Sequence, residues 1–283
     1  MTRKKNSSNR IRSILMFVFI STFLIFSSIL AIHFYKQYQE KEDFKNLSTI
    51  ISSNNTSENE QESTIINKKN NEIKNKIIEE NENKTNDEKV ILADYKELYE
   101  ENNELYGWLR IDGTNIDYPV MYSPDEPQFY LHKNFNKEDS FSGTPFILVP
   151  DTNNIIIYGH NMKNKTMFSA LRNYKDMKFW KKNPYIEFDT LYEKNIYEIF
   201  AVTNTVVYYD ENEIPYDSYL FYQHTDLSTK EEFNDYIKNI KANAYFDSKI
   251  SPTYGDSIIT LCTCDYVTEN VRLLVIAREI QRN

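Results

Sequence analysis

Cysteine is scarce in this chain, which contains only two cysteines among its 283 residues. They are Cys262 and Cys264, separated by a single residue in the segment TLCTC. A disulfide between them would be very strained, because two such residues of one extended strand lie near the upper Cα–Cα limit for bridging. No second cysteine pair exists to complete the four ligands of a structural zinc site. The chain therefore has free thiols, which in an exported protein usually mean chemistry.

The sequence also lacks the common motifs of nucleotide-binding and hydrolytic sites. It contains no P-loop, no GxSxG and no HExxH segment. After residue 35, 28 basic residues are outnumbered by 42 acidic ones, which gives this part a formal net charge of −14. A surface of that sign repels nucleic acid and anionic lipid headgroups. We therefore expect no nucleic-acid partner and no membrane contact through a basic patch.

Acidic residues are absent from the first 35 positions, and residues 13–32 contain no charge, Gly or Pro. A helix of this length spans about 30 Å, the thickness of a bilayer core. Five basic residues precede it, so the positive-inside rule predicts a cytoplasmic tail at 1–12, a membrane anchor at 13–35 and an extracellular remainder. The alternative is a cleaved signal peptide, which usually has a shorter apolar region and a small-x-small cleavage site. Ile29-Leu30-Ala31 fits such a site poorly.

The segment that follows lacks the residues of a packed core. Between Lys45 and Asp94 there is no aromatic residue, Gly, Pro or Cys, and Asn, Glu, Lys, Ser and Thr dominate. Such a stretch buries too little apolar surface to offset its ordering entropy. We therefore expect a polar extracellular stalk at 36–89. Isoleucines at positions 65, 66, 73, 77 and 78 leave open a transient amphipathic helix or a partner-binding coiled coil.

Residues 90–283 have the composition of a folded domain. An apolar stripe at positions 92, 95, 98, 99 and 105 predicts a helix that Gly107 ends. Short runs rich in β-branched and aromatic residues then predict strands. Two helices interrupt them, one in TMFSALRNY and one at 228–243 that opens with a capping box of Ser228 and Glu231. Because strands and helices do not alternate regularly, we predict a mainly β fold, a closed barrel with an N-terminal helix and helical insertions.

Cys264 is the candidate nucleophile of this domain. On a strand, Cys262 and Cys264 project to the same face, and Cys264 ends the apolar run, beside the polar stretch DYVTEN. Its thiol is therefore expected at the rim of the barrel, with Cys262 deeper. The alternative is that both cysteines are small hydrophobic residues of a core strand.

A nucleophilic thiol needs a proton donor or acceptor and a group that stabilises charge. Among the four histidines, His160 directly follows the apolar run NIIIYG, and Gly159 permits a sharp turn that presents the imidazole at a strand end. His33 lies at the membrane edge, and His132 and His224 have loop-like surroundings. An ordinary turn histidine remains the alternative for His160.

Arg272 is the candidate stabiliser of negative charge. It opens the last predicted strand, eight residues after Cys264, so an antiparallel pairing of the two strands could place its guanidinium beside the thiol. A guanidinium stays charged and offers several donors to an oxyanion. Arg278, at the other end of that strand, is the less favoured partner. A strand-end arginine that faces water is the alternative for Arg272.

Together these residues resemble the sortase family. The match comprises TLCTC, the histidine of YGHNM about a hundred residues earlier, and the arginine that opens the next strand. The N-terminal helix before GWLRIDGTNIDYPV, the YGHNM…MFSAL continuation and the helical segment 228–243 resemble class B. Two departures are Cys262, where class B often has serine, and FILVPDTNN, which does not carry the Asp and Arg that often follow the GSIF-type segment of the family.

The resemblance implies a membrane-anchored cysteine transpeptidase. Cys264 would attack the threonine carbonyl of a C-terminal sorting motif, of Asn-Pro-x-Thr type, in a secreted protein. His160 would protonate the departing amine, Arg272 would hold the oxyanion, and an amine of a peptidoglycan precursor would take the acyl group. Leu131, Tyr158, Cys262 and Thr263 would line the substrate site. No metal or organic cofactor is implied, and a productive thiolate–imidazolium pair predicts a bell-shaped pH profile.

The residues leave two other functions open. An exported thiol peptidase would differ only in letting water, rather than an amine, reach the thioester. A non-catalytic wall-associated binding module would carry its cysteines as remnants. The presence of His160, Cys264 and Arg272 together argues against the module.

Overall fold

A computed structural model describes residues 3–69, 90–208, 210–215, 218–265 and 270–280; among these, the side chains of 3–11, 54–69 and 211 are not described. The chain divides into two compact units, Met1–Asp43 and Phe44–Asn283. Helix α1 (Arg3–Lys69) supplies most of the first unit. Within the described residues, one helical span, Arg12–Ser53, is long and apolar enough to cross a membrane, with a mean hydropathy of 2.5 in its most apolar window.

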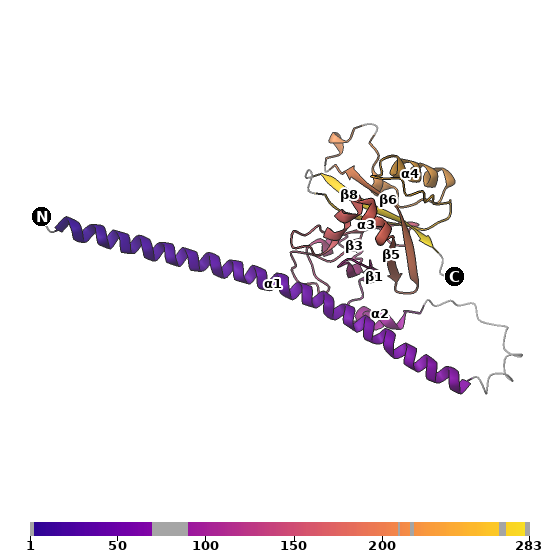
Figure 1. Cartoon of the computed structure of the whole chain (residues 1–283), viewed down its shortest axis with the longest axis horizontal. Helices are drawn as coiled ribbons and strands as arrows, with labels where there is room; N and C mark the ends of the chain where they lie inside the picture. Colours follow the sequence, from indigo (N-terminus) through magenta and orange to yellow (C-terminus); the bar gives the residue numbers. More distant parts are fainter. Residues whose placement is uncertain (1–2, 70–89, 209, 216–217, 266–269, 281–283) are drawn as a thin grey trace, which may run out of the picture. The chain divides into compact units, whose positions relative to one another are not determined.

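The second unit is built on a closed barrel, which confirms the predicted fold class (Figure 1). Around the barrel the strand order is β1-β2-β3-β4-β7-β8-β6-β5. Their bounds are β1 (Leu105–Arg110), β2 (Asp117–Met121), β3 (Phe146–Ile147), β4 (Asn154–Tyr158), β5 (Tyr185–Thr190), β6 (Lys194–Val206), β7 (Ile258–Cys264) and β8 (Val271–Ile280). β4 pairs with β7 in parallel, and β7 pairs with β8 in antiparallel orientation. Segments a hundred residues apart in the chain thus become neighbours at the site.

The pleat of β7 divides its side chains between two apolar clusters. Ile259 and Leu261, both fully buried, belong to the cluster that fills the barrel. Ile258 and Cys262 belong to a second cluster outside it, which includes Phe233 of α4. Because both faces of β7 are covered, the strand reads as an almost continuous apolar run.

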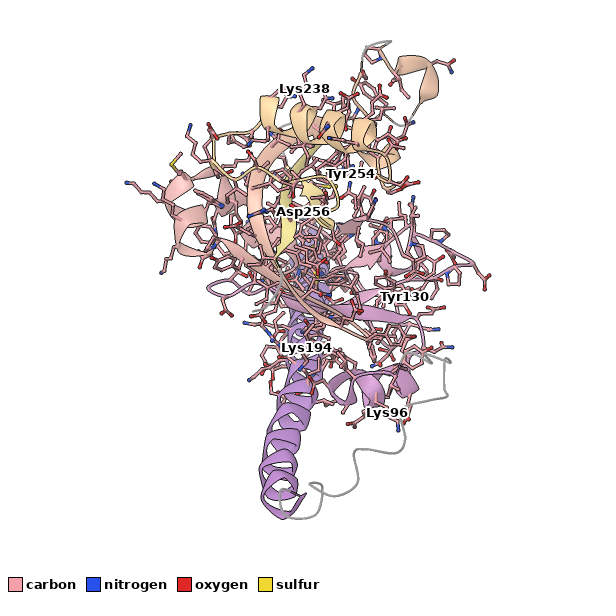
Figure 2. All side chains as sticks on the ribbon, turned by 90° about the vertical axis from the view of Figure 1, so that its right-hand side faces the viewer. Lys96, Tyr130, Lys194, Lys238, Tyr254 and Asp256 are labelled. Atoms are coloured by element: carbon pink, nitrogen blue, oxygen red, sulfur yellow. The ribbon has the colours of Figure 1, made fainter. Side chains whose placement is uncertain are left out.

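Helices and 3₁₀ turns cover the barrel. The α-helices are α2 (Ala93–Glu101), α3 (Met177–Lys182) and α4 (Lys230–Ala242), and the 3₁₀ segments are η2 (Phe129–Leu131), η3 (Phe168–Lys175), η4 (Glu211–Glu213) and η5 (Phe221–Gln223). An ion pair between Asp94 of α2 and Lys194 of β6 ties α2 to the barrel; Lys194 is labelled in Figure 2. Figure 2 also shows Lys238 on the outward side of α4.

Two details of the expected helices are wrong. α2 ends at Glu101, and Gly107 lies within β1, where an added Cβ would meet the Asp189 carbonyl oxygen at 2.3 Å. Gly107 is needed for the close approach of β5 and does not cap a helix. The cap of α4 lies one residue later than expected, because the Thr229 hydroxyl accepts from the Glu232 amide and donates to the Glu232 carboxylate.

The first part of the expected stalk differs from its prediction. Phe44 is 6% exposed, Ile51 is 1% exposed, and both belong to core clusters of the second unit. Phe44 packs edge-on against Tyr118 at 5.1 Å, and the Ser48 hydroxyl donates to Asp117 at 2.5 Å. Phe44 and Ile51 are seven residues apart and therefore lie on one face of the helix, although the segment is polar in composition. The side chains of the isoleucines at 65, 66, 73, 77 and 78 lie outside the described residues, and so does the end of the stalk at 70–89.

Candidate active site

The end of β7 places Cys264 directly opposite Arg272. These two residues are partners in the antiparallel ladder between β7 and β8. Side chains of directly paired residues share one face of a sheet, with Cβ atoms about 4.5–5.5 Å apart. The guanidinium is braced by a hydrogen bond from its Nη1 to the carbonyl oxygen of Val271 at 3.3 Å. The structure therefore brings a thiol and a permanent cation together on one face.

His160 follows the end of β4, which lies next to β7. The parallel ladder ends at the pair Tyr158 and Cys262, and the Gly159 amide then donates to the Cys262 carbonyl at 3.1 Å. The Thr263 hydroxyl donates to the Gly159 carbonyl at 2.7 Å. These bonds extend the pairing one residue beyond β4, so His160 lies beside the end of β7, where Cys264 is.

Gly159 is needed here for a reason other than the expected one. Its φ is not among the positive values of the chain, so no left-handed turn requires it. Instead, an added Cβ would lie 2.7 Å from the ring of Phe168, the first residue of η3. The Phe168 amide in turn donates to the His160 carbonyl at 2.9 Å. Close packing of η3 against the β4 end thus positions the histidine backbone.

The His160 ring is held by a backbone carbonyl. Its Nε2 lies 3.0 Å from the Leu131 oxygen, which can only accept, so Nε2 carries a proton and the neutral ring presents Nδ1 as its acceptor. Burial lowers the pKa of His160; the bond to Leu131 opposes this, and the nearby imidazole of His132 adds to the lowering. The two rings lie 5.7 Å apart. His132, which the sequence placed in an ordinary loop, is therefore a neighbour of the site.

The two cysteines differ in burial as expected. Cys262 is 2% exposed, and Cys264 is partly exposed. Burial raises the pKa of Cys262 to about 12, although the charge of Arg272 lowers it. Cys262 is therefore a neutral thiol at physiological pH, and Cys264 is the accessible sulfur.

All seven residues that the sequence singled out line one groove of about 400 Å³: Leu131, Tyr158, His160, Cys262, Thr263, Cys264 and Arg272. Phe146, Val207 and Tyr222 also line it and were missed. Val207 and Tyr222 come from the long connection between β6 and β7, whose position across the groove no local pattern specifies. The high content of aromatic residues in this connection was the only feature of the sequence that could have indicated its place at the groove. The groove is lined mainly by apolar side chains, and the thiol of Cys264, the imidazole of His160 and the guanidinium of Arg272 are among its lining groups.

A buried ion pair next to the thiol was also missed. Asp265, which follows Cys264, is fully buried and accepts from both Lys175 of η3, at 2.6 and 2.7 Å, and Asn204 of β6, at 2.6 Å. Asn161 donates to the Cys264 carbonyl at 2.7 Å. Since burying a carboxylate is costly unless it is paired, these contacts are required to hold the β7 end in place.

Two of the residues that the sequence set aside do not line the groove. Arg278, at the other end of β8, pairs with Glu198 at 3.0 Å and with Asp256 at 3.6 Å. His224 stacks on Tyr219 at 4.5 Å, and burial lowers its pKa. Among the described residues, no group of three or more His, Cys, Asp or Glu side chains is arranged to hold a metal ion.

Comparison with known proteins shows the family to which this chain belongs. The sortase domain family matches residues 109–280. This chain belongs to the sortase family. Sortase B of Listeria monocytogenes is 36% identical over 188 residues, which cover 64% of this chain and 71% of that protein. The expected class B membership is thereby confirmed, and with it a cysteine transpeptidase.

Solved structures of class B sortases agree with this. Sortase B of Clostridium perfringens is 37% identical, with a TM-score of 0.57 over 66% of this chain and 99% of that one. A structure of sortase B from Bacillus anthracis has a TM-score of 0.65, covering 88% of this chain and 100% of that one, at 24% identity. At that identity the likeness shows the fold alone.

Proposed function

We propose that this sortase is anchored in the membrane, cleaves a C-terminal sorting motif after threonine through a thioacyl intermediate on Cys264, and transfers the protein to a peptidoglycan amine. The motif is of the Asn-Pro-x-Thr type. The observation that carries the proposal is the cross-strand pairing of Cys264 with Arg272 in an apolar groove that His160 also lines. A groove of that size takes a short peptide segment.

The chemistry follows from the position of each group. The Cys264 thiolate attacks the threonine carbonyl, and the oxyanion that forms accepts hydrogen bonds from the Arg272 guanidinium. The C–N bond then breaks, and the departing amine takes a proton from the imidazolium. Since Nε2 is engaged by Leu131, this proton comes from Nδ1. The second amine attacks the thioester, returns a proton to the imidazole and releases the thiolate.

The resting protonation state of His160 follows from its burial. The lowered pKa of His160 leaves its ring mostly neutral at pH 7, so the thiolate–imidazolium form is a minor species. Within the described residues, the imidazole bonds to Leu131 and not to the Cys264 sulfur. Activity should therefore have a bell-shaped dependence on pH.

The N-terminal part supplies the location. The run at 13–35, preceded by basic residues, anchors the chain with its N-terminus in the cytoplasm and its catalytic unit facing the cell wall. The clients are secreted proteins with a C-terminal sorting signal. No organic cofactor or metal takes part.

The test uses the full chain in a neutral detergent, a panel of sorting peptides, and reactions with and without an amine acceptor, with products identified by mass. We expect cleavage after threonine and a new amide with the acceptor. Cys264→Ala should abolish cleavage, whereas Cys262→Ser should retain most of it. A free acid as the only product would indicate a peptidase, and activity lost in Cys262→Ser but kept in Cys264→Ala would reverse the assignment. Equally slow labelling of both thiols without cleavage would indicate a binding module.

A further inference from the structure

Basic residues concentrate in one segment next to the site. Asn161–Lys182 contains seven basic residues and one acidic residue, in a chain whose formal net charge is −9. The segment starts directly after His160 and comprises the loop before η3, η3 itself and α3. The surplus is therefore local, and it opposes the charge of the rest of the protein.

These cations surround a hollow of about 1290 Å³ that is separate from the peptide groove. Four basic side chains line it and no carboxylate does: Lys163, Lys165, Arg172 and Lys175. Lys163 and Lys165 are exposed, and in the described part of the chain neither forms an ion pair. Lys175 is engaged by Asp265, and Arg172 lies 3.9 Å from the same carboxylate. Like charges gathered around a concave surface repel one another unless an anion is bound.

The hollow and the groove are lined by adjacent residues of the chain. His160 lines the groove, and the next residue, Asn161, lines the hollow while donating to the Cys264 carbonyl at 2.7 Å. Lys175 of the hollow contacts Asp265, the residue after Cys264. One side of the β7 end is therefore apolar and suited to a peptide, and the other side is cationic.

We propose that this basic hollow binds the anionic groups, carboxylate or phosphate, of the amine acceptor during the second half of the reaction. The inference rests on the proposed transpeptidation. The amine nitrogen forms a bond to the thioester carbonyl, the C–S bond breaks, the amine proton passes to the imidazole, and Cys264 leaves as the thiolate. The hollow contributes by raising the occupancy of the acceptor at the β7 end, and it leaves acylation by the donor peptide unchanged.

The test compares acceptors that differ in charge, using the full chain in neutral detergent with one donor peptide. Triglycine is matched with triglycinamide for a carboxylate, and 2-aminoethyl phosphate with ethanolamine for a phosphate. The variant is Lys163→Gln with Lys165→Gln. The control is Lys181→Gln with Lys182→Gln, two exposed lysines of the same segment that do not line the hollow.

We expect the wild type to prefer one anionic acceptor over its neutral partner, and the preferred pair identifies the group. An exposed charge pair contributes up to about fivefold in affinity, so the double variant should lose roughly tenfold in kcat/KM for that acceptor. Its kcat/KM for the neutral partner and its rate of donor hydrolysis should not change, and neither should any rate of the control.

Equal use of charged and neutral acceptors by the wild type would overturn the inference, as would equal losses in the variant and the control. Either result would leave transpeptidation intact, because an amide product would still form. A wild-type enzyme that forms neither an acyl-enzyme nor an amide with any acceptor would instead overturn the proposed function.

Discussion

Replacing Arg272 with lysine tests the proposed oxyanion stabilisation. The lysine keeps a positive charge opposite Cys264 but loses the planar set of donors and the Nη1 bond to Val271 that braces it. Losing one oxyanion donor typically costs 10²–10³ in rate, or about 3–4 kcal/mol. We therefore expect kcat/KM of Arg272→Lys to fall by about that factor, and that of Arg272→Ala to fall further. The melting temperature should change little, because Arg272 is partly exposed at the rim.

The assay is peptide cleavage by the full chain in detergent, with thermal unfolding measured on the same samples. Arg278→Lys is the matched control, since it lies on the same strand but pairs with Glu198 and Asp256 at the opposite end. Such partly exposed pairs contribute at most about 1 kcal/mol, so the control should lose little stability and no activity. Comparable losses of kcat/KM at both arginines, in proportion to a lower melting temperature, would show that Arg272 is structural and refute the reasoning.

Three further predictions concern stability and location. Lys175→Met should destabilise the fold by about 3 kcal/mol in urea unfolding, because the buried Asp265 carboxylate loses its nearest cation and keeps only Arg172, at 3.9 Å; adding Asp265→Asn should restore part of the loss. Burial lowers the pKa of His160 and of His224, so below about pH 6.5 the unfolded chain binds more protons than the folded one. The free energy of unfolding should therefore fall as the pH drops from 7.5 to 5.5, and a constant value would contradict this. Protease added to intact cells should remove the catalytic unit, and full protection would contradict the proposed topology of the anchor at 13–35.

Much of the site could be predicted because its chemistry is carried by local patterns. The apolar run that ends at Cys264 predicts a strand with the thiol at its rim, and NIIIYG predicts the strand before His160. The seven residues between Cys264 and Arg272 leave room only for a short connection, so an antiparallel pair was expected and is observed. The expected substrate-lining residues also lie in the groove, although their roles stay proposals.

The errors have physical reasons in packing between distant segments. The role of Gly107 depends on the approach of Asp189, and that of Gly159 on the ring of Phe168, neither of which is near in sequence. The packing of Phe44 on Tyr118 was concealed by polar neighbours, since a few apolar residues per helix face are enough once a partner surface exists.

The sequence alone therefore determined the class of fold and pointed to a candidate thiol nucleophile with candidate partners, because strand periodicity and residue chemistry are local properties. Only the tertiary structure decided which groups meet. The parallel pairing of β4 with β7 brings His160 to Cys264, and the packing of η3 brings Lys175 to the buried Asp265. An apolar groove and a basic hollow lie on this framework. Each is lined by side chains from segments that are distant in sequence, so neither could be read from a local pattern.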